Sequence, residues 1–184
     1  MAVGTGQWTA RIWRKEKLSD SGQVDASSTP KRGIIVGIDG SAAAAQALAW
    51  AVDEARLRST PLKIVSAWET PYLDWGEAFP LPQEPEREAL EHARSIAEQA
   101  ASQVAAQFSE LDVSSEAVEG SPAGRLIELS ESAELLVVGS RGRGGFAGLI
   151  LGSVSQQCVA HAHCPVVVVH GSTVAGPTER SGPR

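Results

Sequence analysis

The stretch GIIVGIDGSAAAAQALAWAVDEARLRS, residues 33–59, decides the fold class. Its first seven residues are a short apolar run rich in β-branched side chains, which is typical of a strand buried on both faces. Ser41 then stands at the N-cap position of an alanine-rich segment that carries Arg56 and Arg58 in its last turn, where the helix dipole favours cations. The stretch predicts a strand over 33–39 followed at once by a helix over 41–59.

The same alternation of strand and helix continues along the chain. Further strands are predicted at 61–68, 111–118, 133–140 and 165–171, and further helices at 87–108, 121–132 and 153–163. Pro122 suits the first turn of a helix, and Ser153 with Gln156 matches a capping box. Apolar strands that alternate with helices predict an α/β fold, a doubly wound five-stranded parallel sheet with helices on both faces.

The segments outside this pattern are two ends and one long connection. Residues 1–32 and 171–184 show no sustained period and are rich in Ser, Gly and Pro, so we expect an extension and a tail around one domain at 33–170. The connection 69–86 holds four prolines and three aromatic residues. Its length is typical of lids and binding loops.

Charge and hydropathy argue against two classes of partner. The net charge is −6, and residues 33–170 carry eight basic and eighteen acidic side chains, whereas nucleic-acid binding needs a basic surface. No run of 18 apolar residues is present, so we expect no membrane span. Because residues 1–22 also lack the apolar segment of a secretory signal, we expect a cytoplasmic protein.

Two cysteines, Cys158 and Cys164, flank His161 and His163. Their spacing is wider than the close pairs of a structural zinc site. We therefore expect two reduced thiols with packing roles, and we assign no metal site.

Ligands of doubly wound sheets bind beyond the carboxyl ends of the strands, where the strand order reverses. The connections that follow Asp39, Trp68, Val118 and Gly139 therefore form the candidate binding region. Asp39 has two interpretations that the sequence leaves open. It either caps the following turn or accepts hydrogen bonds from a ribose hydroxyl.

The glycine-rich stretch VVGSRGRGGFAGLILGSVS, residues 137–155, joins a buried strand to a helix. Glycines let a backbone approach a phosphate, and the N-terminus of a helix presents unpaired N–H groups and a positive dipole end. Ser153 adds a hydroxyl, while Arg141 and Arg143 add positive charge within an acidic domain. Phosphate binding is favoured over the alternative, a surface loop with two solvated arginines.

Two familiar phosphate motifs do not apply. A P-loop requires a lysine that this stretch lacks, since the chain has only Lys15, Lys17, Lys31 and Lys63. Positions 142, 144 and 147 match G-x-G-x-x-[GA], but the following strand does not end in the acidic residue that a dinucleotide site needs. We therefore reject NAD binding.

The spacing G-x2-G-x9-G-[ST] resembles the signature of ATP-binding universal stress proteins. Four residues carry this resemblance: Gly139, Gly142, Gly152 and Ser153. Three further segments resemble the opening strand of that family, the loop before its third helix and its closing strand: VGIDGS at 36–41, GSPA at 120–123 and CPVVVV at 164–169. The resemblance covers about residues 33–170.

The resemblance implies a flavodoxin-like fold, also called adenine-nucleotide alpha hydrolase-like, with strand order 3-2-1-4-5. It implies that ATP is the cofactor, with Mg²⁺ as a candidate companion ion. Asp39 would contact the ribose beside Gly37 and Ile38, Ala67 would contact adenine, and the glycine-rich stretch would hold the ribose and phosphates. The implied nucleotide-binding residues are Gly37, Ile38, Asp39, Ala67, Val138, Gly139, Ser140, Arg141, Gly142, Gly152, Ser153, Val154 and Ser155.

The resemblance also implies a regulatory protein that senses a nucleotide in stress response or dormancy, and a homodimer formed through the edge strand 165–170. An unpaired edge strand of four valines is an aggregation hazard. This argument favours an interface that covers the strand, and it does not depend on the resemblance. Two alternatives stay open on the same fold, a slow ATPase or phosphoryl-transfer enzyme and a cyclic-nucleotide-binding protein. Ser153 has no general base in its motif, because His161 and His163 lie two to three turns along the same helix, so we assign no catalytic residue.

Overall fold

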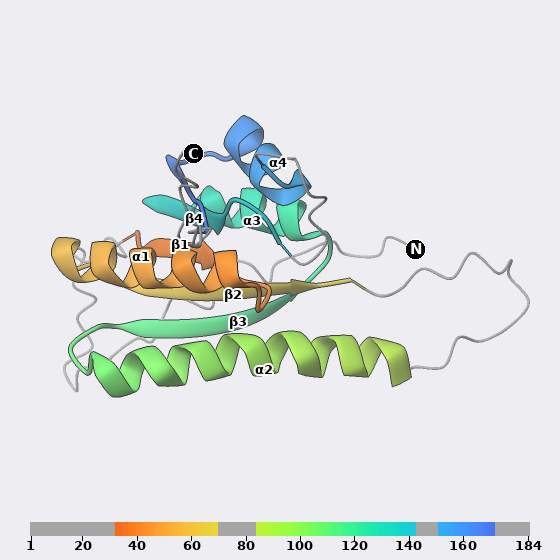
Figure 1. Cartoon of the computed structure of the whole chain (residues 1–184), viewed down its shortest axis with the longest axis horizontal. Coiled ribbons are helices and arrows are strands. Elements are labelled where there is room, and N and C mark those ends of the chain that lie inside the picture. Colours follow the sequence, from red (N-terminus) through yellow and green to blue (C-terminus); the bar gives the residue numbers. More distant parts are fainter. Residues whose placement is uncertain (1–31, 70–83, 143–150, 172–184) are drawn as a thin grey trace, which may run out of the picture.

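A five-stranded parallel sheet forms the centre of the structure, a computed structural model that describes residues 32–69, 84–142 and 151–171 (Figure 1). Its strands are β1 (Ile34–Gly37), β2 (Leu62–Trp68), β3 (Val113–Glu119), β4 (Leu135–Gly139) and β5 (Val166–Val169). They lie in the order β3-β2-β1-β4-β5, and every neighbouring pair is parallel. The predicted fold class and strand order are confirmed.

Helices cover both faces of the sheet. They are α1 (Ala42–Arg58), α2 (Glu84–Gln107), α3 (Pro122–Ser130) and α4 (Ser153–His161). Helices α1 and α2 pack on one face, and α3 and α4 pack on the other, as the separation of the two core clusters shows (Figure 1). Each of the strands β1 to β4 is thus followed by a helical crossover that covers the sheet, as parallel pairing requires.

The core follows the alternation of side chains along each strand. Ile34 and Val36 of β1 face α1 and α2, whereas Ile35 faces α3 and α4, and all three are buried. On α1, Ala47 and Ala51 have no exposed surface, because small side chains let this helix approach the strands closely. The apolar runs of the sequence are therefore strands buried on both faces.

The helix ends agree with the sequence at α1 and differ at α2. Ser41 is the N-cap of α1, and its Oγ accepts a hydrogen bond from the Ala44 N–H at 3.2 Å. Helix α2 begins at Glu84 rather than at residue 87, because Pro85 is tolerated in a first helical turn, where its missing N–H has no partner to lose. Residues 84–86 are thus helical and do not belong to the predicted connection.

Several predictions fall on residues that the structure does not describe. These are most of the connection 69–86, the middle of the glycine-rich stretch with Arg143, and almost all of the predicted extension and tail. Among the described helices, none is long and apolar enough to cross a membrane.

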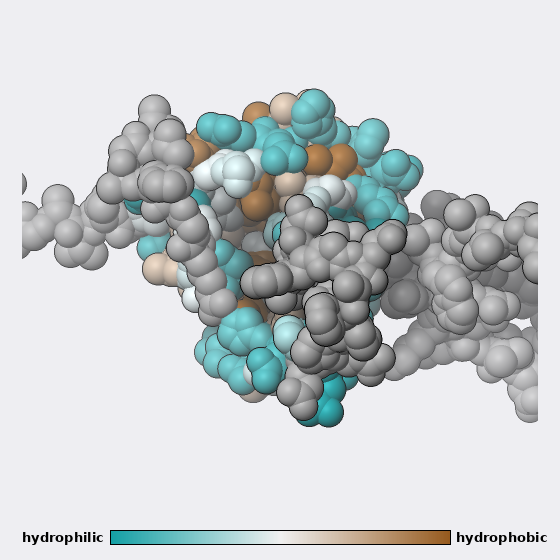
Figure 2. Space-filling view, turned by 90° about the vertical axis from the view of Figure 1, so that its right-hand side faces the viewer, coloured by the Kyte–Doolittle hydropathy of each residue, from teal (hydrophilic) through white to brown (hydrophobic). Residues whose placement is uncertain are grey.

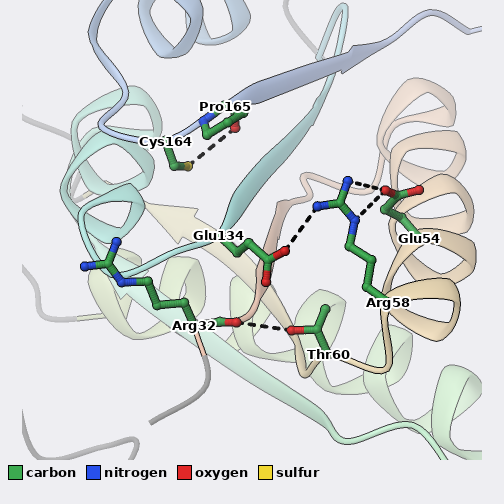
Figure 3. A network of polar contacts seen from close by, with 7 residues as sticks. All are labelled: Arg32, Glu54, Arg58, Thr60, Glu134, Cys164 and Pro165. Carbon is green, nitrogen blue, oxygen red and sulfur yellow. Dashed lines mark hydrogen bonds and ion pairs between the residues drawn. The ribbon is translucent and has the colours of Figure 1, made fainter. Parts of the chain in front are cut away.

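Polar contacts tie α1 to the amino-terminal edge of the sheet, opposite the carboxyl ends of the strands (Figure 3). Arg58 donates to Glu54 within α1 and to Glu134 just before β4, the latter at 3.1 Å. The hydrogen bond to Glu54 is the main cause of a raised pKa of Arg58. The Thr60 hydroxyl donates to the backbone oxygen of Arg32 at 3.1 Å, just before β1. Because Arg58 is partly exposed, we expect these pairs to fix geometry more than to add stability.

Truncation of the core should be costly. Leu136 lies in β4 and has no exposed surface, so Leu136→Ala should lower the free energy of unfolding by about 2–5 kcal/mol in urea denaturation. The matched control is Leu57→Ala, whose side chain is 80% exposed and should change the free energy by less than about 0.5 kcal/mol. Similar losses in both variants would contradict this packing.

Candidate functional site

A cavity of about 600 Å³ lies at the carboxyl ends of β1, β2 and β4. Its wall is completed by residues of α2 and by the first turns of α3 and α4. Figure 2 views the molecule from this side, where hydrophobic side chains lie between hydrophilic groups above and below them. The position is the one expected for a doubly wound sheet, because the strand order reverses between β1 and β4. The connection that leaves β1 leads to β2 on one side, and the connection that leaves β4 leads to β5 on the other.

The structure brings nearly all of the sequence-predicted site residues into this wall. Those that line the cavity are Gly37, Ile38, Asp39, Ala67, Val138, Gly139, Arg141, Gly142, Gly152, Ser153, Val154 and Ser155. The exception is Ser140, which is 2% exposed and lies outside the lining. Its N–H donates to the Val169 oxygen at 2.7 Å, so Ser140 joins β4 to β5.

Asp39 caps a turn and lines the cavity at the same time. Its Oδ1 accepts a hydrogen bond from the Ser41 N–H at 3.0 Å, which is the turn geometry that the sequence allowed. Its Oδ2 would lie 2.6 Å from a Cβ atom added to Gly142, closer than real Cβ contacts. A side chain at position 142 would therefore displace the carboxylate, so glycine there keeps Asp39 in place.

The start of α4 corrects one prediction. Gly152, not Ser153, is the N-cap, with extended backbone angles (φ −80°, ψ 167°) and no side-chain cap. The Gly152 oxygen already accepts the Gln156 N–H at 3.0 Å, so the Ser153 backbone belongs to the helix and its hydroxyl cannot take the capping position. The predicted capping box of Ser153 and Gln156 is wrong.

The first turn of α4 is anchored to the end of β4. The Ser140 oxygen accepts a hydrogen bond from the Gly152 N–H at 2.7 Å. The Ser155 hydroxyl lies 2.9 Å from the Gly152 oxygen and 3.1 Å from the Ser140 oxygen, so its one proton is shared between these two acceptors. The cavity is lined by Ser153, Val154 and Ser155, the first residues of this helix. Because no side chain caps this terminus, it is a suitable site for an anion.

The glycines of the cavity serve different needs. A Cβ atom on Gly139 would lie 2.9 Å from the Ala43 carbonyl carbon, so packing against the α1 backbone requires this glycine. A Cβ atom on Gly37 would lie 2.7 Å from a terminal methyl group of Leu126, whose side chain would have to shift. A Cβ atom on Gly152 would meet nothing closer than the Ser140 oxygen at 3.5 Å, an ordinary contact. Among the described residues, packing therefore leaves room for a side chain at position 152, where glycine also serves as the N-cap of α4.

Sequence reasoning missed the other half of the cavity. These further lining residues are Ala44, Val65, Ser66, Trp68, Glu69, Ala89, His92, Ala93, Ile96, Pro122 and Leu126. A signal existed in α2, since Ala89, Ala93 and Ile96 follow helical spacing on one face. The part of that face that meets the cavity depends on how α2 docks against β2 and β3. The periodicity of the sequence does not predict this docking position.

Both cysteines are free thiols. Cys158 has no exposed surface, and burial raises its pKa to about 11, while burial also raises the pKa of the half-buried Cys164. A thiol with a raised pKa is a poor nucleophile at neutral pH. Within the described ranges, no group of three or more His, Cys, Asp or Glu side chains is arranged to hold a metal ion.

Comparison with known proteins agrees with the fold and identifies the family. The model of the universal stress protein family matches residues 31–170. The chain belongs to the universal stress protein family. The resemblance seen in the sequence motifs is thereby confirmed at the level of the family.

The curated relatives of this chain include mycobacterial proteins. Universal stress protein Rv2623 of Mycobacterium tuberculosis is 37% identical over 161 residues, which cover 86% of this chain and 54% of the relative. Rv2624c of the same species is 39% identical over 136 residues, which cover 74% of this chain and 47% of the relative. The chain thus spans about half the length of the curated relatives it matches.

Solved structures share the fold over most of their length. UspA from Lactobacillus plantarum has a TM-score of 0.63 at 24% identity, covering 76% of this chain and 97% of that one. A universal stress protein solved in complex with cAMP has a TM-score of 0.57 at 28% identity, covering 77% of this chain and 99% of that one.

Burial of Cys158 predicts a specific alkaline effect. A folded pKa of about 11 lies above the ordinary value of 9.0, so above pH 9 the unfolded chain releases this proton first and folding loses stability up to pH 11. Cys158→Ala removes this contribution. The difference in free energy of unfolding between wild type and variant should therefore shift by at most about 2–3 kcal/mol between pH 8 and pH 11, in favour of the variant. A difference that stays constant with pH would contradict the assignment.

Proposed function

We propose that this protein binds ATP in the cavity at the carboxyl ends of β1, β2 and β4, and that it acts as a nucleotide-dependent regulator in stress response or dormancy. The observation that carries the proposal is the start of α4. Because Gly152 is the N-cap, no side chain caps or covers the N-terminus of α4. This N-terminus lines the cavity. Such a terminus is a binding site for phosphate.

The phosphate end of the cavity has further support. Arg141 is exposed and lines the cavity next to Gly142, and Ser153 presents an exposed hydroxyl at the first helical position. An arginine, a hydroxyl and unpaired N–H groups together suit a polyphosphate chain. In a domain with excess negative charge, this concentration of donors is selective for an anion.

The ribose and base would lie over β1 and β2. The Asp39 carboxylate lines the cavity above β1, where it can accept hydrogen bonds from ribose hydroxyls. Beyond it, Ile38, Ala67 and Leu126 give the cavity an apolar wall. A flat base is the part of a nucleotide that suits such a wall.

Cyclic AMP is the second candidate ligand, because one related structure contains it. A cyclic monophosphate needs fewer donors than Arg141, Ser153 and the α4 terminus offer together, which favours ATP. Competitive titration with ATP, AMP and cyclic AMP separates these ligands. Tighter binding of cyclic AMP than of ATP would overturn the choice.

A regulatory role is favoured over hydrolysis. His161 lies at the opposite end of α4 from Ser153, about 12 Å along the helix axis, too far to act as its general base. Asp39 and Glu69 are the carboxylates of the described lining, and Asp39 is the one beside Gly142 that could share Mg²⁺ with the phosphates. Phosphate release measured with and without Mg²⁺ tests this choice, since rapid turnover would make the protein an enzyme.

Bulk at Gly152 should abolish nucleotide binding without unfolding the protein. Gly152→Val should weaken ATP affinity at least about tenfold in equilibrium titration, because the side chain occupies the approach of the phosphates to α4. The matched control is Gly171→Val. An added Cβ there lies no closer than 3.9 Å to its neighbours, and the residue does not line the cavity. Both variants should keep a native far-UV spectrum, and unchanged affinity in Gly152→Val would contradict the site.

We also propose a homodimer formed through β5. This strand ends the described sheet, and its four valines are all half-buried. The Pro165 and Val169 oxygens accept hydrogen bonds from β4, so by parallel alternation the N–H groups of Val166 and Val168 point away from β4. No other described strand lies on this side of β5, so these groups are placed to pair with a second chain. A cytoplasmic location fits the two free thiols, which stay reduced there.

A proline on the open edge should therefore separate the protomers. Val168→Pro removes an outward N–H and should shift sedimentation from dimer to monomer while the fold persists. Val167→Pro is the control, because it removes an N–H that faces β4, so it should lower the melting temperature instead. A folded Val168→Pro variant that stays dimeric would place the interface elsewhere.

A further inference from the structure

The strand β3 is the second edge of the described sheet, and one side of its backbone faces away from β2. The Asp112 oxygen, just before β3, accepts the Leu62 N–H at 2.9 Å. The Gly120 N–H, just after β3, donates to the Trp68 oxygen at 2.8 Å. Backbone groups alternate in direction along a parallel strand, so the even-numbered residues of β3 face β2. The outward backbone groups belong to Val113, Ser115, Ala117 and Glu119.

This outward side of β3 is a surface for strand pairing. No described strand lies beyond β3, and Figure 1 shows α2 alongside it on one face. At seven residues, β3 is as long as β2, its neighbour in the sheet. An open edge of this length is a template for an added strand, because each outward residue offers an N–H and a carbonyl oxygen.

A hollow of about 230 Å³ lies beside this edge, between β3 and α2. Ala97, Ser115 and Ala117 form part of its wall, and these short side chains leave room for a side chain of an added strand. The other residues of the wall are charged, namely Arg94, Glu98 and Glu116. The hollow therefore suits a polar or charged side chain.

The acidic groups around this edge favour a basic segment. Asp112 and Glu119 are exposed at the two ends of β3, and Glu98 is exposed on α2. The nearby cations are Arg94, Lys63 and Arg125. Lys63 and Arg125 are already paired with carboxylates, those of Glu116 and Glu128. A segment of opposite charge is therefore favoured at this edge.

The amino-terminal extension contains a basic segment with the pattern of a strand. Residues 7–17, QWTARIWRKEK, hold four basic side chains, one acidic side chain, and neither proline nor glycine. Trp8, Ala10 and Ile12 alternate with polar residues, which is the period of a strand. Trp, Thr and Ile also favour extended backbone. The segment lies outside the described residues, and its sequence complements the edge of β3 in charge.

The segment is long enough and suitably tethered to reach this edge. Arg32 stands just before β1, and residues 18–31, fourteen in all, separate it from Lys17. A strand beyond β3 would lie three strand spacings from β1, about 14 Å, whereas fourteen extended residues span about 45 Å. A segment antiparallel to β3 would also end at the amino-terminal edge of the sheet, where Arg32 lies.

We propose that residues 7–17 pair with β3 as a sixth, antiparallel strand of the sheet. The main-chain hydrogen bonds of such a pairing provide affinity, and the basic side chains beside Glu98 and Glu119 favour this segment over an acidic one. The tether raises the effective concentration of the segment at the edge. This interaction is independent of nucleotide binding and of the interface at β5.

Amide hydrogen exchange of the full-length ¹⁵N-labelled protein tests the pairing residue by residue. We expect slow exchange at the outward amides of Ser115 and Ala117, and equally at the inward amides of Glu116 and Val118, because both sides of β3 are hydrogen-bonded. Rapid exchange at Ser115 and Ala117 beside slow exchange at Glu116 and Val118 would overturn the proposal.

A pair of charge reversals assigns the protection to the segment. Arg11→Glu with Arg14→Glu should speed exchange at Ser115 and Ala117 at least about tenfold, because the segment then opposes the acidic edge. Exchange at the inward amides should stay as in wild type, which shows that the sheet is intact. Unchanged protection at Ser115 and Ala117 would overturn the role of residues 7–17.

The matched control is Arg180→Glu with Arg184→Glu, which makes the same change of net charge at the other end of the chain. It should leave exchange along β3 as in wild type, and an equal loss of protection in both double variants would contradict the assignment. Dilution tests whether the pairing lies within one chain. Protection of Ser115 and Ala117 that falls on dilution would assign the edge to a second copy and overturn the proposal.

Discussion

The carbonyl oxygen of Ser140 is the junction on which the site depends. It accepts a hydrogen bond from the Gly152 N–H and shares the Ser155 hydroxyl proton with the Gly152 oxygen, while the Ser140 N–H donates to the Val169 oxygen. One buried residue thus ties the end of β4 to β5 and to the start of α4. Ser140 is not itself part of the cavity wall. Its role is to hold the N-terminus of α4 toward the cavity, which lies where the strand order reverses.

Close packing around this junction leaves little freedom at the strand ends. Gly37 and Gly139 allow Leu126 of α3 and the backbone of α1 to approach within distances that a side chain would forbid. Gly142 is constrained by the Asp39 carboxylate in the same way. Gly152 differs, because an added Cβ would meet its described neighbours only at ordinary distances of 3.5 Å or more. The glycine spacing of the family therefore combines close packing at Gly139 with a position, Gly152, whose described neighbours leave room for a side chain.

The sequence predicted the elements better than it predicted the site. Apolar β-branched runs such as residues 34–37 identify strands reliably when both faces are buried, and the strand order came from the family resemblance. Local signals failed at two helix starts, because Pro85 is tolerated in a first turn and Gly152 competes with Ser153 for the N-cap. The wall that contains Ser66 was missed because it depends on the docking of α2.

The central claim is that the cavity holds an adenine nucleotide with its phosphates at the start of α4. Amide chemical-shift mapping of the ¹⁵N-labelled protein during ATP titration tests it most directly. The account predicts large shifts at Gly152 and Ser153, from the phosphates, together with shifts at Ile38 and Ala67, from the ribose and base. Shifts confined to residues outside the cavity, or no shift at saturating ATP, would contradict it.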